Sequence, residues 1–300
     1  MGTGKKIWRI AYPLIIWFGA HSIVQYIYLF VKAFEYIGKL GSDALDIFND
    51  PSEFQSILNS LYDAVLKDSL ILTLVCNAVT IAVLLVFYIF DKTKWDKNNL
   101  LHKNTVKNPL QYALNIVIAI SSCILFNLIM AIVMSFAVSV FGEEILSSYN
   151  DVSTSIYNSP LYIQVITAVI SAPICEELLM RGLVYKRMRS FMRPLYSALI
   201  SSVIFGLIHG NWVQFMYAFA VGLIATYIYE YTRTLFAPIL FHITANATST
   251  LISLEGVDEY AETLMYGDAF INVTLALTTV CIVTGLIAMS LISKRRLLKQ

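Results

Sequence analysis

The sequence predicts an all-α polytopic membrane protein, a bundle of about eight transmembrane helices with both termini in the cytoplasm. Its composition, its long uncharged runs and the separation of charge between loops lead to this class. Hydrophobic residues make up 58% of the 300 residues and charged residues only 14%, and the mean hydropathy is +0.69, values typical of membrane proteins. The net charge of +1 gives no reason to expect a nucleic acid or another polyanionic partner.

Uncharged stretches of about 20 residues can cross a hydrocarbon core of about 30 Å, and they mark the candidate spans. We expect eight, over residues 10–31, 69–90, 110–141, 159–185, 194–210, 212–231, 234–253 and 269–292. The first begins like a signal peptide but runs on too long and lacks a small-residue cleavage site, so we expect a retained helix. The longest loop, 32–68, is too short for a soluble domain. Residues 1–300 should therefore form one integral membrane domain.

The loops between the spans alternate in charge, which tests the predicted helix count. Clusters of Lys and Arg at 92–107, 186–193 and 294–299 are assigned to the cytoplasm, where positive residues accumulate. Clusters of Asp and Glu fall in the loops assigned outside, at 43–68, 143–151 and 255–268. Within the first outer loop, "PSEFQSILNSLYDAVL" has apolar residues at helical spacing, which indicates an amphipathic helix on the outer membrane surface.

Two adjacent carboxylates interrupt the fourth span, in "SAPICEELLMRGLVYKR". Ionisable residues at bilayer depth are costly, so Glu176 and Glu177 are a functional hypothesis by default. Arg181 follows Glu177 by four residues, the favourable acid-before-base order for a salt bridge on one helical face. Glu176 projects about 100° away from that face and is left free for other partners.

The candidate partners lie at a similar depth on other helices. His209 ends the fifth span, and His242 and Asn246 share a face of the seventh. At about 1.5 Å per residue, Glu176 lies about 15 Å from its cytoplasmic helix end, and the other three lie about 12 to 20 Å from theirs. His21 stands alone in the first span and is expected to be structural.

This set of residues suits the hydrolysis of a carbonyl substrate. A carboxylate that faces a histidine in a partly dry cavity can take a proton from water. A second histidine and an amide NH2 can donate to a developing oxyanion. The competing interpretation is a polar network that only holds three helices together. The four cysteines, Cys76, Cys123, Cys175 and Cys281, all lie in apolar runs and predict neither a disulfide framework nor a nucleophile.

Three motifs resemble the CPBP family of intramembrane proteases, also called Abi or type II CAAX endopeptidase-like. "APICEELLMRG" is similar to its EExxxR motif, with Glu176, Glu177 and Arg181; "FGLIH" is similar to FxxxH, and "HITAN" to HxxxN. The matching core covers about residues 160–250. The resemblance implies an endopeptidase acting on a membrane-associated peptide or protein. It also implies that Glu176 and His209 activate water while His242 and Asn246 bind the oxyanion, with Glu177 and Arg181 in support.

The family is often described as metalloproteases, and a zinc ion on Glu176, His209 and His242 is the alternative to a metal-independent glutamate mechanism. No ligand pair here has the close spacing of HExxH, and Asn246 suits an oxyanion better than zinc, so we expect no firm metal requirement.

Two other functions use similar residues. A proton-coupled transporter is expected to consist of two similar halves, and the sequence shows no such internal duplication. A catalytically idle scaffold or bacteriocin-immunity protein of the same fold is the main alternative. The richness in Lys, Asn, Ile and Tyr indicates a low-GC bacterium, and we expect a multi-pass protein of its plasma membrane.

Overall fold

The structure is a computed structural model of the chain and describes residues 2–40, 51–94, 108–254 and 268–297. The described residues contain helices and no strands, which confirms the predicted all-α class. Besides the motif-bearing segment, the described α-helices are α1 (Thr3–Leu40), α2 (Pro51–Lys67), α3 (Ser69–Lys94), α4 (Pro109–Phe141), α5 (Ser147–Tyr157), α9 (Pro194–Leu207), α10 (Trp212–Thr232), α11 (Phe236–Ile252) and α13 (Asp268–Leu297).

Six described helices are long and apolar enough to cross a membrane, so the chain is a polytopic membrane protein, but the predicted count of eight is not confirmed. The two remaining predicted spans correspond to α9 and α11, with 14 and 17 residues. At about 1.5 Å per residue they reach about 21 and 26 Å, less than a hydrocarbon core of about 30 Å. α9 stops at Leu207 rather than 210 because a turn follows it, in which Gly210 has a φ of 79°.

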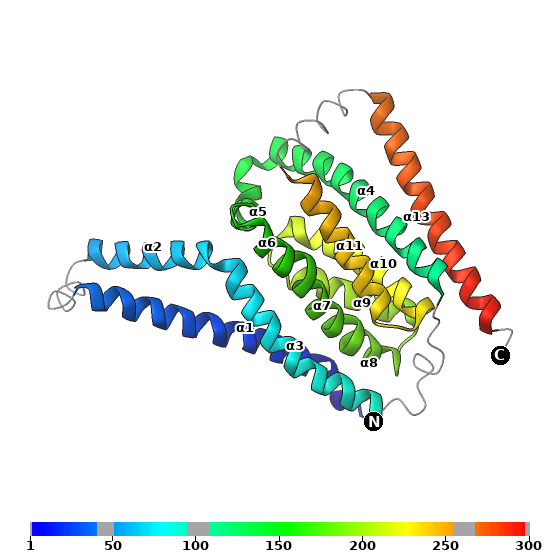
Figure 1. Ribbon diagram of the computed structural model, residues 1–300, viewed down its shortest axis with the longest axis horizontal. Coiled ribbons are helices and arrows are strands. Elements are labelled where there is room, and N and C mark those ends of the chain that lie inside the picture. The colour runs from blue at the N-terminus through cyan, green and yellow to red at the C-terminus, as the bar shows by residue number, and fades with distance from the viewer. Residues whose placement is uncertain (1, 41–50, 95–107, 255–267, 298–300) are drawn as a thin grey trace.

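The bundle packs closely where glycines face neighbouring helices. α9 lies along α10, and α4 contacts both α11 and α13 (Figure 1). A Cβ atom added to Gly222 of α10 would lie 2.9 Å from Ser202 Oγ of α9, and one added to Gly206 of α9 would lie 2.6 Å from a ring carbon of Phe215. These helices can therefore approach only because both positions lack a side chain.

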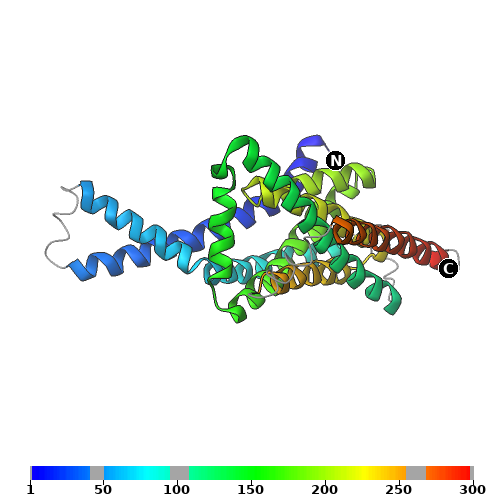
Figure 2. The same ribbon diagram turned by 90° about the horizontal axis from the view of Figure 1, so that it is seen from above.

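α1 and α2 form an arm that extends away from the bundle in both ribbon views (Figures 1 and 2). The helix predicted in the first outer loop is present as α2. Tyr28 OH of α1 donates to Asp68 Oδ2, just after α2, at 2.6 Å. The described part of α1 is longer than the predicted span 10–31, with 38 residues.

The segment with the two glutamates is one irregular helix. It runs through α6 (Leu161–Gln164), η4 (Val165–Ser171), α7 (Ala172–Glu177), η5 (Leu178–Tyr185) and α8 (Lys186–Arg189), and both η4 and η5 are π-helical. π-Helical turns are rare and are frequent at functional sites. Here they flank the two glutamates on both sides.

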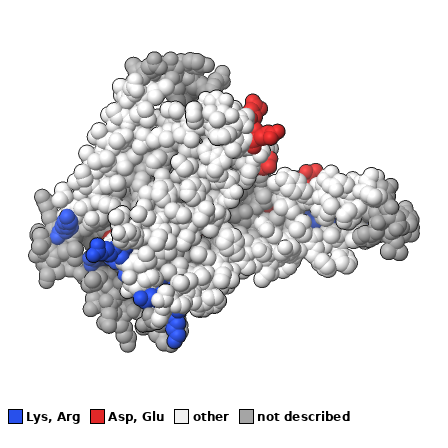
Figure 3. Space-filling model, turned by 180° about the vertical axis from the view of Figure 1, so that it is seen from behind, with Lys and Arg blue, Asp and Glu red and all other residues white. Residues whose placement is uncertain are grey.

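Charge is separated along the bundle. On the face shown in Figure 3, Lys and Arg side chains gather toward one end of the bundle and Asp and Glu toward the other. The end of α8 and the turn after it, with Arg189 and Arg193, lie at one end of the bundle, the basic end. The segment of η3 (Glu143–Leu146) and α5, with the exposed Glu143, Glu144 and Asp151, lies toward the other, the acidic end (Figure 1). This separation agrees with the loop charges used to predict cytoplasmic termini, which stay a prediction.

Candidate active site

All four predicted catalytic residues line one cavity of about 1100 Å³. Glu176 comes from α7, His209 follows α9, and His242 and Asn246 come from α11. Positions more than 60 residues apart along the chain are thus brought to one space. The catalytic roles of these four residues stay predictions. Their contacts indicate what each side chain can do chemically.

The two adjacent glutamates have different surroundings. Glu177 is fully buried, and its Oε1 lies 2.6 Å from NH1 of Arg181, whose side chain is 1% exposed. Arg181 NH2 also donates to the Gly222 carbonyl at 2.9 Å, which ties the motif helix to α10. The side chain of Glu176 is 20% exposed and lines the cavity. The predicted ion pair is therefore present, and the second carboxylate remains accessible.

His242 joins the two glutamates. Its Nδ1 lies 3.0 Å from Glu177 Oε1, and its Nε2 lies 3.7 Å from Glu176 Oε2. A carboxylate paired with an arginine accepts hydrogen bonds, so we assign the proton to Nδ1, which donates to Glu177. This orients Nε2 toward Glu176. The sequence predicted Arg181 as the partner of Glu177 but not the contact of Glu177 with His242. The two residues are 65 positions apart, and helical spacing predicts contacts only between near neighbours in the chain.

His209 is oriented by its own helix end. Its Nδ1 lies 2.8 Å from the Phe205 carbonyl oxygen, so Nδ1 carries the proton and donates. Nε2 is then left with a free lone pair. Among the described residues no hydrogen bond or ion pair joins His209 to Glu176, so the predicted pair shares a cavity without direct contact.

Phe205 lies at the centre of the cluster. Its ring centroid is 4.9 Å from that of His209 and 5.9 Å from that of His242, both edge-on. The Arg181 guanidinium carbon lies 5.0 Å from the same ring. The side chain is 1% exposed. Phe205, the first residue of the FxxxH motif, thus contacts three functional side chains at once.

Asn246 is bound to the irregular helix. Its Nδ2 donates to the Ala168 carbonyl at 2.8 Å. In the π-helical η4, Ala172 N–H bonds Thr167 O, so the N–H of residue 173 would bond Ala168 O, but that residue is Pro173 and has no N–H. Asn246 therefore satisfies the carbonyl that the proline leaves free. One of its two amide hydrogens remains for a substrate.

The residues predicted as the alternative zinc ligands do not form a compact donor set. Within the described ranges, no group of three or more His, Cys, Asp or Glu side chains lies close enough together to hold a metal ion. His242 already uses Nδ1 on Glu177, and Glu176, His209 and His242 do not meet at one point. Zinc dependence stays a prediction for experiment.

Two other residues that the sequence singled out lie outside the cavity. Cys175 is fully buried. His21 Nδ1 donates to the Trp17 carbonyl at 2.9 Å, and its ring centroid is 4.3 Å from that of Trp17. Both contacts are those of a structural side chain.

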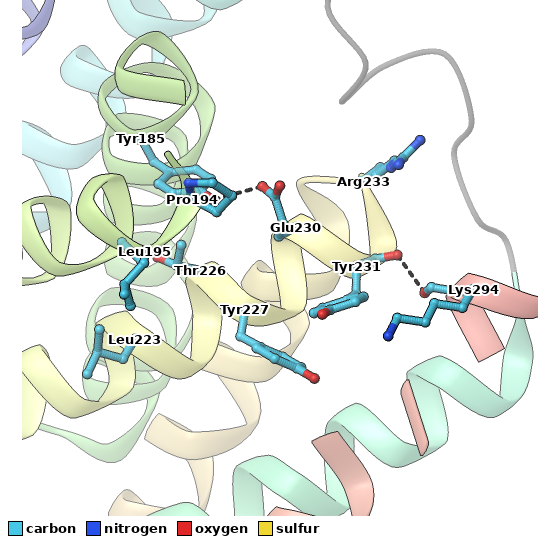
Figure 4. Close-up of a pocket in the computed structure, with 12 residues that line it drawn as sticks. Tyr185, Pro194, Leu195, Leu223, Thr226, Tyr227, Glu230, Tyr231, Arg233 and Lys294 are labelled. Atoms are coloured by element: carbon cyan, nitrogen blue, oxygen red, sulfur yellow. Dashed lines mark hydrogen bonds between the residues drawn. The ribbon is translucent and has the colours of Figure 1, made fainter. Parts of the chain in front are cut away.

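A second cavity, of about 500 Å³, lies at the basic end of the bundle (Figure 4). Its carboxylate, Glu230, accepts from Tyr185 OH at 2.7 Å and from Arg189 NH2 at 2.8 Å. None of the described residues that line it is a histidine. Its carboxylate is therefore already occupied, and no histidine accompanies it among the described lining residues.

Comparison with known proteins identifies the motif-bearing segment. Residues 158–248 match the family model described as type II CAAX prenyl endopeptidase Rce1-like. The chain is also similar to the putative membrane peptidase YdiL of Bacillus subtilis (strain 168), with 29% identity over 100 residues. That alignment covers 33% of this chain and 41% of the relative. No solved structure matches the chain. These findings confirm the predicted resemblance to the CPBP, or CAAX protease, family.

Proposed function

We propose that this chain, whose residues 158–248 match the type II CAAX prenyl endopeptidase Rce1-like family model, is an intramembrane endopeptidase that cleaves a membrane-associated peptide or protein. The observation that carries the proposal is the unequal environment of the two glutamates. Glu177 is closed off by Arg181, whereas Glu176 faces a cavity large enough for a peptide segment and near two histidines.

In the first step, Glu176 acts as the general base. It takes a proton from a water molecule in the cavity, and the oxygen of that water attacks the carbonyl carbon of the scissile peptide bond. The free Nε2 of His209 accepts the second hydrogen of the water and orients it. This role requires the tautomer that the Phe205 carbonyl selects.

The negative charge on the tetrahedral intermediate needs donors already in place. Glu177 holds His242 through Nδ1. When Nε2 also carries a proton, the ring can donate to the oxyanion, and both Glu176 and Glu177 face its positive charge. The unused amide hydrogen of Asn246 is the second donor. The intermediate collapses when Glu176 returns its proton to the leaving amine nitrogen, which breaks the C–N bond.

Glu177 and Arg181 act on the site through other groups. Arg181 fixes Glu177, Glu177 fixes His242, and Phe205 packs against Arg181 and both histidines. No step passes through a metal ion, since the described donors do not assemble into a metal site.

The test is turnover by purified protein in lipid nanodiscs, with a library of quenched fluorescent peptides, each with and without an attached lipid chain. We expect cleavage by the wild type and a loss of about 10²- to 10⁴-fold in Glu176→Gln, the usual contribution of a general base. The amide keeps the shape of the side chain, so the melting temperature should not change.

Glu230→Gln is the matched control, because it makes the same change in the second cavity, and we expect its rate to stay near that of the wild type. Full activity in Glu176→Gln would refute the glutamate mechanism. If the active protein contains stoichiometric zinc, and if a chelator removes both the zinc and the activity, the glutamate mechanism is wrong and the protein uses metal catalysis. Absence of turnover in the wild type, with every peptide, would favour the idle scaffold or immunity protein.

A further inference from the structure

The active-site cavity extends toward one end of the bundle. From Asn246 its lining continues along α11 to Ser249 and Ser253, and it takes in residues of α5 and the start of α3 at Ser69. α5 directly follows the acidic stretch that contains Glu143 and Glu144, and Asp151 itself lines the cavity. The cavity therefore runs from the catalytic cluster to the acidic end seen in Figure 3.

In the opposite direction the active-site cavity ends: none of its described lining residues lies between 177 and 188, and it shares none with the second cavity at the basic end. Every residue from 178 to 188 is buried, so the stretch of the motif helix between Glu177 and the basic end offers no path. At that end Arg187 closes the packing: its Nε bonds Asp91 Oδ2 at 2.7 Å, and its NH1 bonds the Arg9 carbonyl at 2.6 Å. The described part of the chain therefore shows no opening from the active-site cavity toward the basic end.

Positive residues accumulate on the cytoplasmic side of membrane proteins, which assigns the basic end to the cytoplasm and the acidic end to the outside. We propose that the active site opens only to the outer face of the membrane. Its substrate is then a polypeptide segment exposed on that face, such as an exported peptide, and not one presented from the cytoplasm. The substrate class rests on the proposed peptidase function, whereas the direction of opening does not.

The lining of the outer part of the cavity fits a polypeptide. It is rich in hydroxyl groups, which come from Ser148, Tyr149, Ser153, Tyr157, Ser249 and Thr250. A peptide backbone that leaves water must keep its N–H and C=O groups hydrogen-bonded, and hydroxyls can both donate and accept. A long hydrocarbon chain would instead leave these hydroxyls desolvated and unpaired.

The direction of opening can be measured without activity. In a background with the four native cysteines replaced by alanine, Ser249→Cys places one thiol in the cavity, about one helical turn from Asn246. A membrane-impermeant maleimide is added to intact cells and, separately, to sealed inverted vesicles. We expect labelling in intact cells and its loss in inverted vesicles.

Two exposed positions calibrate the two sides. Glu144→Cys at the acidic end should label only in intact cells, and Arg193→Cys at the basic end only in inverted vesicles. Ser253→Cys, nearer the acidic end, repeats the measurement if Ser249→Cys does not accumulate. Labelling of the cavity thiol from the same side as Arg193→Cys would overturn the proposal. So would labelling of Glu144→Cys from the cytoplasm, or protection of both cavity positions from both sides.

An activity experiment then tests the substrate class. A membrane-impermeant peptide that purified protein cleaves should be cut by intact cells expressing the wild type and not by cells expressing Glu176→Gln. Sealed inverted vesicles should cut it only after detergent is added. Cleavage by sealed inverted vesicles would overturn the outer-face substrate. If no preparation cleaves any peptide while the labelling pattern holds, the proposed function fails and the direction of opening stands.

Discussion

The two cavities of this protein are each lined by a carboxylate within a membrane-embedded bundle. They differ in whether that carboxylate already has hydrogen-bonding and charged partners. Glu230 accepts hydrogen bonds from Tyr185 and Arg189, which occupy both of its oxygens. Next to the other cavity, Arg181 pairs with Oε1 of Glu177, whereas Glu176, which lines this cavity, has no Lys or Arg partner among the described residues. In this bundle the number of hydrogen-bonding and charged partners separates a structural carboxylate from a candidate base.

The largest effect should come from breaking the buried ion pair. Glu177→Gln leaves Arg181, 1% exposed, without its charge partner, and breaking such a pair typically costs about 3 to 5 kcal/mol. Glu230→Gln removes the partner of a half-buried Arg189 and should cost about 1 kcal/mol or less. Thermal unfolding in one detergent compares the two. Equal losses of stability in the two variants would mean that Glu177 and Glu230 contribute equally to the stability of the fold.

The next effect separates two roles of Asn246. Asn246→Ala should lower turnover by about 10²- to 10³-fold if its amide donates to the oxyanion. If the amide only satisfies the Ala168 carbonyl, Pro173→Ala supplies the missing N–H and should restore the Asn246→Ala rate. We expect no restoration in the double variant and none with added zinc. Recovery with Pro173→Ala would make Asn246 a structural residue. Recovery with zinc would instead support a metal mechanism.

A smaller effect is expected at the ring between the functional side chains. Phe205→Leu removes ring contacts with His209, His242 and Arg181, each worth about 0.5 to 1.5 kcal/mol. Turnover should fall about tenfold, since about 1.4 kcal/mol corresponds to one factor of ten. Phe219→Leu, which loses a stacked contact with Phe215 outside the cavity, is the control. A rate loss in Phe219→Leu as large as that in Phe205→Leu would show that general packing explains the effect.

The smallest effect concerns the acidic end of the cavity. Asp151→Asn should raise KM a few-fold for peptides rich in Lys, because an exposed carboxylate attracts cations over about a Debye length. The difference should disappear at high salt. Glu35→Gln on the α1 arm, away from the cavity, should leave KM unchanged. A salt-independent change in KM would mean that Asp151 contacts the peptide directly.

Much of the local structure could be predicted because it depends on neighbours in the chain. Apolar runs long enough to span a bilayer predicted the helices, and the spacing of Glu177 and Arg181 predicted their ion pair, since residues i and i+4 share a helical face. The C-terminal end of α9 and the length of α1 were predicted less well. Helix ends depend on turns and on packing, which hydropathy does not encode.

The class of the protein, its three motifs and the residues available for chemistry can be read from the amino-acid sequence. Which of these residues contact one another depends on how distant helices pack. The bond from His242 to Glu177 and the bond from Asn246 to Ala168 join residues 65 and 78 positions apart, and the extension of the cavity toward α5 and not toward the basic end arises from how whole helices pack. Such contacts depend on the relative positions of helices, which local periodicity leaves free, because a helix determines the direction of its side chains but not which helix they meet.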